Sequence, residues 1–154
     1  MEIEVKVEGF GVGPSMMPVL VLGSPEHEKK LCIGCDEFRT FAIATQIGLV
    51  PQEPMPHDLV AKTIGLSGGA LKKIVITRYD AAENLFWATA HVDRNGETAT
   101  IEWGPTDLVA VALRTKSPIY VESDLLEREG VALPQQQDEG LSGMSTCFDK
   151  LPKQ

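Results

Sequence analysis

The chain contains little of several residue types, and each shortage excludes a class of protein. It has only three cysteines among 154 residues, Cys32, Cys35 and Cys147, which is too few, and an odd number, for a disulfide scaffold. No uncharged apolar run approaches the length of about 18 residues that a membrane-spanning helix needs. The N-terminus reads Met-Glu-Ile-Glu-Val-Lys, which is a strand pattern and not a secretion signal. We therefore expect a cytoplasmic protein without a membrane partner.

Basic residues are also scarce. Lys and Arg together number 14 against 22 Asp and Glu, which gives a formal net charge of −8 at pH 7. Such a surface repels a phosphodiester backbone at long range, so charge alone argues against non-specific binding of nucleic acid. Hydrophobic residues make up 43% of the chain, and this share excludes a disordered protein. The length suits one domain with its own core.

The pattern of apolar residues predicts both strands and helices. Short alternating or continuous apolar runs predict seven strands, over residues 2–8, 18–22, 30–33, 71–79, 85–92, 97–103 and 118–121. Apolar residues at helical spacing predict four helices, over about residues 36–47, 57–66, 106–115 and 123–129. The first helix is expected to bury Phe38, Phe41, Ala42 and Thr45. We therefore predict an α+β fold with a mixed sheet of about seven strands and four helices.

The composition changes near the C-terminus. From Val131 onward the sequence becomes polar and loses its periodicity, with Gln135-Gln-Gln137 followed by acidic residues, glycines and serines. Polar terminal segments without periodicity rarely join a packed core. We therefore predict a single domain over residues 1–130 and a mobile tail over residues 131–154.

Two stretches of the sequence are recognisable. Pro56-His-Asp-Leu59 is similar to the motif THDLL, and the later residues Val75-Ile-Thr77 and Phe86-Trp-Ala88 are similar to VVI and FYA. Gly104-Pro-Thr-Asp107 leads through Ala112-Leu-Arg-Thr115 into Pro-Ile-Tyr-Val, ending at residue 121. This second stretch is similar to RPSDAIALALRTGAPIYV.

Together the two stretches resemble the bifunctional nuclease domain family, and the resemblance covers about residues 2–130. The resemblance implies a small cytoplasmic α+β protein that cleaves both RNA and DNA. Nucleic acid is then the expected substrate. The resemblance also implies a homo-oligomer, and we expect a dimer because apolar strands such as Leu85-Phe-Trp-Ala88 need covering in a domain with few helices.

The chain departs from the family pattern at four positions. Gly104 stands where the family has an arginine before Pro-Ser-Asp, and Glu53 replaces the arginine of RPLTHD. Pro56 replaces the threonine before His-Asp, and Cys32 replaces a tryptophan. Arginine can bind a phosphate through two parallel hydrogen bonds. The missing arginines therefore favour an alternative, a non-enzymatic binding or regulatory module, and whether the chain is an enzyme stays open.

Three carboxylates, those of Glu37, Asp58 and Asp107, fall in the first turns of three predicted helices. Phosphodiester hydrolysis needs an activated water and a neutralised transition state, and carboxylates that hold Mg²⁺ or Mn²⁺ provide both. If the three helix starts converge, these side chains can form a metal site. The alternative is that each carboxylate only stabilises its own helix through the dipole.

His57 lies in the first turn of the second predicted helix. A neutral histidine there suits a general base or a metal ligand, and it equally suits a capping or packing role. We therefore predict His57, Asp58 and Asp107 as catalytic residues. The predicted metal ligands are Glu37, Asp58 and Asp107.

Cys32-Ile-Gly-Cys35 is outside the resemblance. It lies between a strand and a helix start, where the helix dipole can activate a thiol, so a redox role is one interpretation. A zinc site is another, although the further ligands His27, His57 and Cys147 have no diagnostic spacing. We favour buried, inert thiols, because Cys32 stands at a core aromatic position of the family pattern.

Overall fold

The computed structural model describes residues 1–133, so residues 134–154 of the predicted tail lie outside the described residues. Its strands are β1 (Glu2–Val12), β2 (Pro18–Gly23), β3 (Lys29–Gly34), β4 (Gly69–Asp80), β5 (Leu85–Arg94), β6 (Glu97–Trp103), β7 (Ile119–Glu122) and β8 (Val131–Ala132). Its α-helices are α1 (Glu37–Ala44), α2 (Pro56–Leu66), α3 (Pro105–Thr115) and α4 (Ser123–Glu129). Two single-turn 3₁₀ helices occupy Pro14–Met16 and Thr45–Ile47. The predicted α+β class is therefore confirmed.

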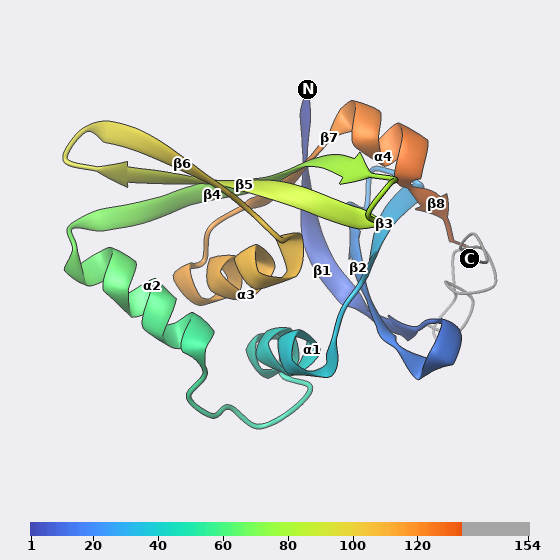
Figure 1. Ribbon diagram of the computed structural model, residues 1–154, viewed down its shortest axis with the longest axis horizontal. Coiled ribbons are helices and arrows are strands. Elements are labelled where there is room, and N and C mark those ends of the chain that lie inside the picture. Colours follow the sequence, from blue (N-terminus) through green and yellow to red (C-terminus); the bar gives the residue numbers. More distant parts are fainter. Residues whose placement is uncertain (134–154) are drawn as a thin grey trace.

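All eight strands belong to one mixed sheet in the order β6-β5-β4-β7-β1-β2-β3-β8. Every neighbouring pair is antiparallel except β4 and β7, which are parallel. Figure 1 shows α1, α2 and α3 together below the long strands β4, β5 and β6. Helix α4 instead contacts β3, β4 and β7. None of the helices within residues 1–133 is long and apolar enough to cross a membrane.

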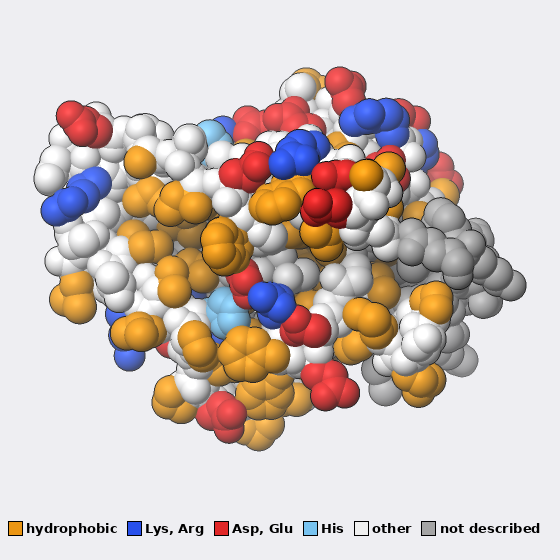
Figure 2. All heavy atoms as spheres, in the orientation of Figure 1, with side chains coloured by type: hydrophobic (Ala, Val, Ile, Leu, Met, Phe, Trp, Pro, Cys, Tyr) orange, Lys and Arg blue, Asp and Glu red, His pale blue; other side chains and the backbone are white. Residues whose placement is uncertain are grey.

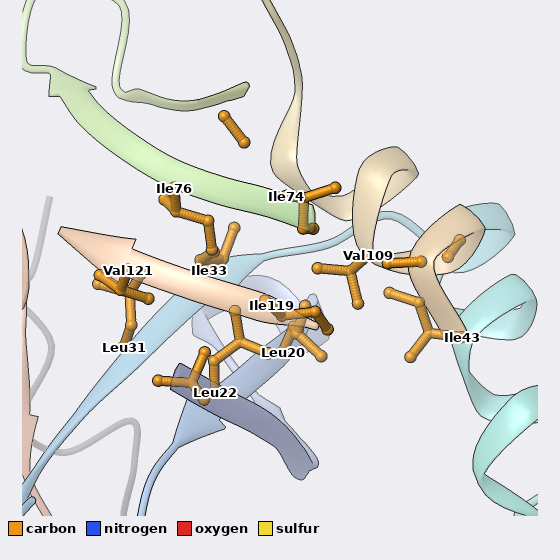
Figure 3. Close-up of a cluster of buried hydrophobic side chains, with 14 of the residues drawn as sticks. Leu20, Leu22, Leu31, Ile33, Ile43, Ile74, Ile76, Val109, Ile119 and Val121 are labelled. Carbon is orange, nitrogen blue, oxygen red and sulfur yellow. The ribbon is translucent and has the colours of Figure 1, made fainter. Parts of the chain in front are cut away.

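The core lies where the central strands of the sheet meet the helices. Figure 3 shows side chains from β2, β3, β4 and β7 meeting those of α1 and α3. Leu20, Ile74 and Val109 are each 0% exposed. Four consecutive residues of α3, from Val109 to Ala112, are buried. Such burial on all sides fits the uninterrupted apolar run of this helix, and it fixes the position of the first turn of α3.

Two boundaries and the exposure of one side chain differ from the sequence-based expectation. The first strand continues to Val12 because a bulge between Val7 and Gly9, with φ +145° at Gly9, carries it past the glycine-rich stretch. The two-residue strand β8 pairs with Lys29 and Lys30, so the domain extends beyond residue 130. Phe38, expected in the buried stripe, is 51% exposed, because α1 turns this side chain away from the sheet.

Candidate functional site

Asp107 is the centre of the candidate site. Strand β6 ends at Trp103, Gly104 caps the next helix, and Asp107 follows in the first turn of α3. Its Oδ1 atom accepts hydrogen bonds from His57 Nε2 and Arg39 Nε, both at 2.8 Å. Its Oδ2 atom accepts a hydrogen bond from Trp103 Nε1 at 3.0 Å. One carboxylate therefore joins side chains from α1, α2 and β6.

These contacts keep Asp107 ionised. Burial alone would raise its pKa, but the hydrogen bonds from His57, Arg39 and Trp103 together lower the pKa below the ordinary value. An ionised carboxylate can only accept hydrogen bonds, so Nε2 of His57 carries the proton in this contact. Nδ1 of His57 is then the basic nitrogen of the ring.

His57 lies behind Asp107 and is only 5% exposed. Its Nδ1 atom is buried and has no hydrogen-bond partner within residues 1–133. The ring of Phe38 lies beside the imidazole, with 5.8 Å between the ring centroids. His57 is therefore oriented by Asp107 on one side and enclosed on the other, and its second nitrogen is unsatisfied.

Arg39 lies between two carboxylates. Asp36 caps α1 by accepting a hydrogen bond from the backbone N–H of Arg39 at 2.8 Å, and it also pairs with Nη1 of the guanidinium. The hydrogen bond to Asp107 is the main cause that raises the pKa of Arg39. The arginine side chain is 41% exposed, so a permanent positive charge remains accessible beside Asp107.

Asp58 lies in a separate cluster. Its Oδ2 atom accepts the backbone N–H of Met55 at 2.9 Å, and its Oδ1 atom accepts Nε of Arg114 at 2.8 Å. Arg114 also donates to the carbonyl oxygens of Ala42 and Ala110. Burial would raise the pKa of Asp58, but the bonds from Met55 and Arg114 outweigh it and the pKa is lowered. These contacts tie α1, α2 and α3 together.

Glu37 lies apart from both clusters. It is exposed in the first turn of α1, and no hydrogen bond or ion pair joins it to Asp58 or Asp107 in the described part of the chain. The three carboxylates do not gather in one cluster among residues 1–133, since Asp58 and Asp107 bond to different arginines. Of the four predicted site residues, only His57 and Asp107 are in contact.

The arrangement does not fit the predicted divalent metal. Among residues 1–133, no three His, Cys, Asp or Glu side chains gather so that they could hold a metal ion. Oδ1 of Asp107 already accepts two hydrogen bonds, which use both of its lone pairs. Both oxygens of Asp58 are also engaged. The catalytic and metal-binding roles of these residues stay predictions.

A cavity of about 980 Å³ lies in front of Asp107. Arg39, Asp36 and Asp107 form a polar part of its wall, and four aromatic side chains line it nearby: Tyr79, Phe86, Trp87 and Trp103. It continues to residues 128–131, between α4 and β8. Figure 2 shows hydrophobic side chains gathered around a small group of histidine, acidic and basic side chains on one face.

Two residues of the site were not predicted as functional. Neither Arg39 nor Trp103 is among the site residues that the sequence predicts. The only local signal for Arg39 is its i, i+3 spacing from Asp36, which is common in helices. Its contact with Asp107 spans 68 positions of sequence, and no local pattern reports a contact of that range.

The two described cysteines lie in the core. Cys32 is 8% exposed and Cys35 is 2% exposed, as the interpretation of buried thiols expects. Burial is the main cause that raises the pKa of the Cys35 thiol, which keeps it protonated and less reactive. Cys147 lies outside the described residues.

Comparison with known proteins agrees with the motifs. A model of the bifunctional nuclease domain matches residues 20–134. Two relatives from Mycobacterium tuberculosis are each 37% identical over 138 residues, which covers 88% of this chain and 81% of theirs. They are the uncharacterized proteins Rv1829, from strain H37Rv, and MT1877, from strain CDC 1551. The family match includes His57, Asp107 and Arg39. The chain therefore belongs to the bifunctional nuclease domain family.

Proposed function

We propose that the chain is a nuclease that hydrolyses phosphodiester bonds of RNA and DNA in the cavity beside Asp107. The observation that carries this proposal is the Asp107 carboxylate on the cavity wall, bonded at once to His57, Arg39 and Trp103. A base, an orienting carboxylate and a cation within one cluster are the parts that hydrolysis of a charged ester needs. Membership of the family supports the same activity.

Arg39 is the residue we assign to the phosphate. Its Nε atom is used by Asp107 and its Nη1 atom by Asp36. Within residues 1–133 no acceptor is bonded to Nη2, which can donate to a phosphate oxygen in the cavity. A fixed cation there stabilises the negative charge that develops in the transition state. Arg39 thereby replaces the arginines that the family has at the positions of Gly104 and Glu53.

His57 is the general base in this proposal. Asp107 holds the tautomer in which Nδ1 is free to accept a proton, and it stabilises the imidazolium that forms. A water loses its proton to Nδ1, its oxygen bonds to phosphorus, and the P–O bond to the leaving sugar oxygen breaks. That oxygen takes a proton from solvent. His57 does not line the cavity and its Nδ1 atom is enclosed, so the side chains that cover it must move before a water in the cavity reaches it, and we assign this movement to the half-exposed Phe38.

A cleavage assay tests the proposed nuclease activity together with the predicted requirement for Mg²⁺ or Mn²⁺. Purified full-length chain is incubated with labelled single-stranded RNA or DNA in Mg²⁺, in Mn²⁺ or in a chelator. We expect cleavage by the wild type, and the proposed hydrolysis involves no metal ion. Cleavage that survives the chelator supports the residues alone, whereas strict dependence on added ion supports the predicted ion.

Asp107→Asn tests the residue assignment, because the amide keeps the shape but loses the charge that holds the His57 tautomer. We expect at least a hundredfold loss of cleavage, in the range seen when a general base is lost. Asp124→Asn is the matched control, because Asp124 is an exposed carboxylate in the first turn of α4. A folded wild type that cleaves nothing under any ion condition would overturn the proposal.

A binding module without enzymatic activity is the second candidate, and one observation favours it. His57 is enclosed, and Asp107 is neutralised by its own partners, so the cluster is stable without a substrate. In that case the cavity binds its ligand and releases it unchanged. Saturable binding of an oligonucleotide, with no cleavage in any ion, is the result that distinguishes this candidate.

We also propose a homodimer that pairs along β6. All seven residues of this edge strand are exposed, and β6 pairs only with β5 in the described part of the chain. Natural proteins rarely leave such an edge uncovered. Sedimentation at micromolar concentration should show a species of twice 16.7 kDa, and Thr100→Pro should convert it to monomer. A wild type that sediments as a monomer contradicts this.

A further inference from the structure

We infer that the cavity binds a single strand of nucleic acid, with one base stacked on Trp103 and the adjacent phosphate at Arg39. The inference rests on the proposed function and narrows its substrate to strands whose bases are unpaired. It is carried by the exposure of Trp103, by the aromatic residues of the cavity and by the small number of its cations.

Trp103 is exposed where an ordinary packing residue would be covered. It is the last residue of β6, lines the cavity, and is 55% exposed. Its indole N–H is held by Asp107 Oδ2 at 3.0 Å, so the ring is fixed in orientation. A rigid aromatic ring that is held by its polar atom and open on its face is suited to stacking against a flat ligand.

The other aromatic residues of the cavity already have partners. The rings of Tyr79 and Phe86 pack on each other with 4.8 Å between centroids. The guanidinium of Arg78 lies over the ring of Trp87, 5.1 Å from its centroid. No comparable ring or cation contact occupies Trp103 among the described residues. Trp103 is therefore the stacking surface that the cavity offers.

The size of the cavity suits a short segment of one strand. Pockets of roughly 300–1,000 Å³ enclose ligands of drug-like size, and this cavity measures about 980 Å³. That size class includes one or two nucleotides. The guanidinium of Arg39 and the indole of Trp103 both bond to Asp107, so a phosphate at one lies next to a base at the other.

The charge distribution argues against a duplex. Binding to double-stranded nucleic acid depends on many Lys and Arg contacts to phosphates, whereas Arg39 and Arg128 are the two cations that line the cavity. The whole chain carries a net charge of −8. A duplex also keeps its bases stacked on one another, whereas a single strand presents their faces to an aromatic side chain.

Fluorescence of Trp103 tests the inference directly. The chain has two tryptophans, so Trp87→Phe leaves Trp103 as the only one. Nε1 of Trp87 has no hydrogen-bond partner within residues 1–133, so this change removes no hydrogen bond. We expect a six-nucleotide thymidine strand, titrated in chelator, to quench the emission to saturation. A blunt duplex that is long enough to stay paired under the assay conditions should not. Binding without quenching, or equal affinity for the duplex, overturns the inference.

A pair of substitutions separates stacking from the hydrogen bond to Asp107. Trp103→Leu removes both and should weaken binding of the single strand about tenfold or more, the contribution of one base–aromatic stack. Trp103→Phe keeps an aromatic face and should bind nearly as well as the wild type. Circular dichroism confirms that both variants are folded. Equal binding by folded Trp103→Leu and wild type contradicts the inference.

Binding is read before cleavage is detectable, and the length of the recovered strand checks this, so the two proposals can fail separately. Strand binding that needs Trp103, with no cleavage in any ion, keeps this inference and rejects the nuclease. Cleavage at the wild-type rate by Trp103→Leu, with unchanged strand affinity, keeps the nuclease and rejects this inference.

Discussion

Two carboxylates of this protein have similar local sequences and different surroundings. Asp58 and Asp107 each follow a proline by two positions, and each lies in the first turn of a helix that begins with that proline. Each accepts a hydrogen bond from the Nε of an arginine at 2.8 Å. The arginine side chain on Asp58 is 4% exposed and the one on Asp107 is 41% exposed.

Both are ion pairs between an aspartate and an arginine, so the difference shows what burial of the arginine does to such a pair. Arg114 also donates to backbone carbonyls of two helices. An enclosed, fully bonded arginine of this kind holds the helices together. Arg39 keeps part of its guanidinium at a cavity, where the charge can act on a ligand. We therefore expect the first pair to control stability and the second to control binding.

The largest effect on stability is expected from Arg114→Leu. The change leaves the Asp58 carboxylate without its cation and removes one donor each from the carbonyl oxygens of Ala42 and Ala110, which should cost about 3 kcal/mol in the free energy of unfolding. Urea denaturation followed by circular dichroism measures this loss. A loss below about 1 kcal/mol, which is typical of exposed pairs, would remove the distinction between the two clusters.

Arg39→Leu is the matched comparison to that variant. Because this arginine is partly exposed, its loss should lower the free energy of unfolding by only about 0–1 kcal/mol. Affinity for a single-stranded oligonucleotide, measured on the same preparation, should fall strongly. A variant that unfolds easily and still binds would reverse the roles we assign to the two pairs.

Gly104→Arg restores the arginine that the family has before the helix, and it should strengthen the binding of an oligonucleotide in the cavity. The backbone at Gly104 has φ −63°, and a Cβ atom added there meets nothing within 4 Å, so any side chain fits. A second cation beside Arg39 should tighten oligonucleotide binding about tenfold, since a hydrogen bond to a charged group is worth about 1.5–3 kcal/mol. Gly104→Gln is the uncharged control. Equal affinity of the two variants would place the phosphate elsewhere.

The pH dependence of stability tests the lowered pKa values of both carboxylates. Both have a pKa below the ordinary value of 3.8 in the folded state, so the unfolded chain binds more protons in acid. Their stabilisation is complete above that ordinary pKa and is lost as the pH falls through the lowered values. Thermal unfolding between pH 3 and pH 7 should show this loss. Asp58→Asn and Asp107→Asn should each flatten the acid side of the curve, and an unchanged curve in both would contradict the lowered pKa values.

Glu37→Gln should have the smallest effect. Its carboxylate contributes only the helix dipole interaction, worth about 0.3–1 kcal/mol, and it lies outside the Asp107 cluster. Cleavage with and without Mg²⁺ should match that of the wild type. A loss of metal-dependent cleavage in this variant would restore Glu37 as a metal ligand and require a rearranged site.

The sequence was informative where local patterns decide the structure. Apolar periodicity located every one of the longer strands and all four helices, because burial imposes its period on the chain. It missed β8, since two residues carry no period, and it misplaced Phe38, since helical spacing does not say which side faces a partner. His57 and Asp107, which the helix positions and the family motif indicate, are joined by a hydrogen bond, and their catalytic roles stay predictions.

The sequence could not show which arginine each carboxylate pairs with. The local patterns around Asp58 and Asp107 are nearly the same, so nothing near either residue says which one faces a cavity. That difference depends on Arg39 and Arg114, which reach the carboxylates across 68 and 56 positions of sequence. Contacts of this range are set by the packing of α1, α2 and α3 and become visible only in three dimensions.

The single residue between β6 and α3 has a consequence for assembly. Gly104 alone separates the edge strand from the helix, so Trp103 and Asp107 lie on either side of a connection with no slack. A second chain pairing along β6 would hold that strand by its backbone, and through it the indole that bonds to Asp107. Dilution would then separate the two chains and loosen the tryptophan before either chain unfolds. The concentration of the protein would therefore determine how firmly the carboxylate is held in position.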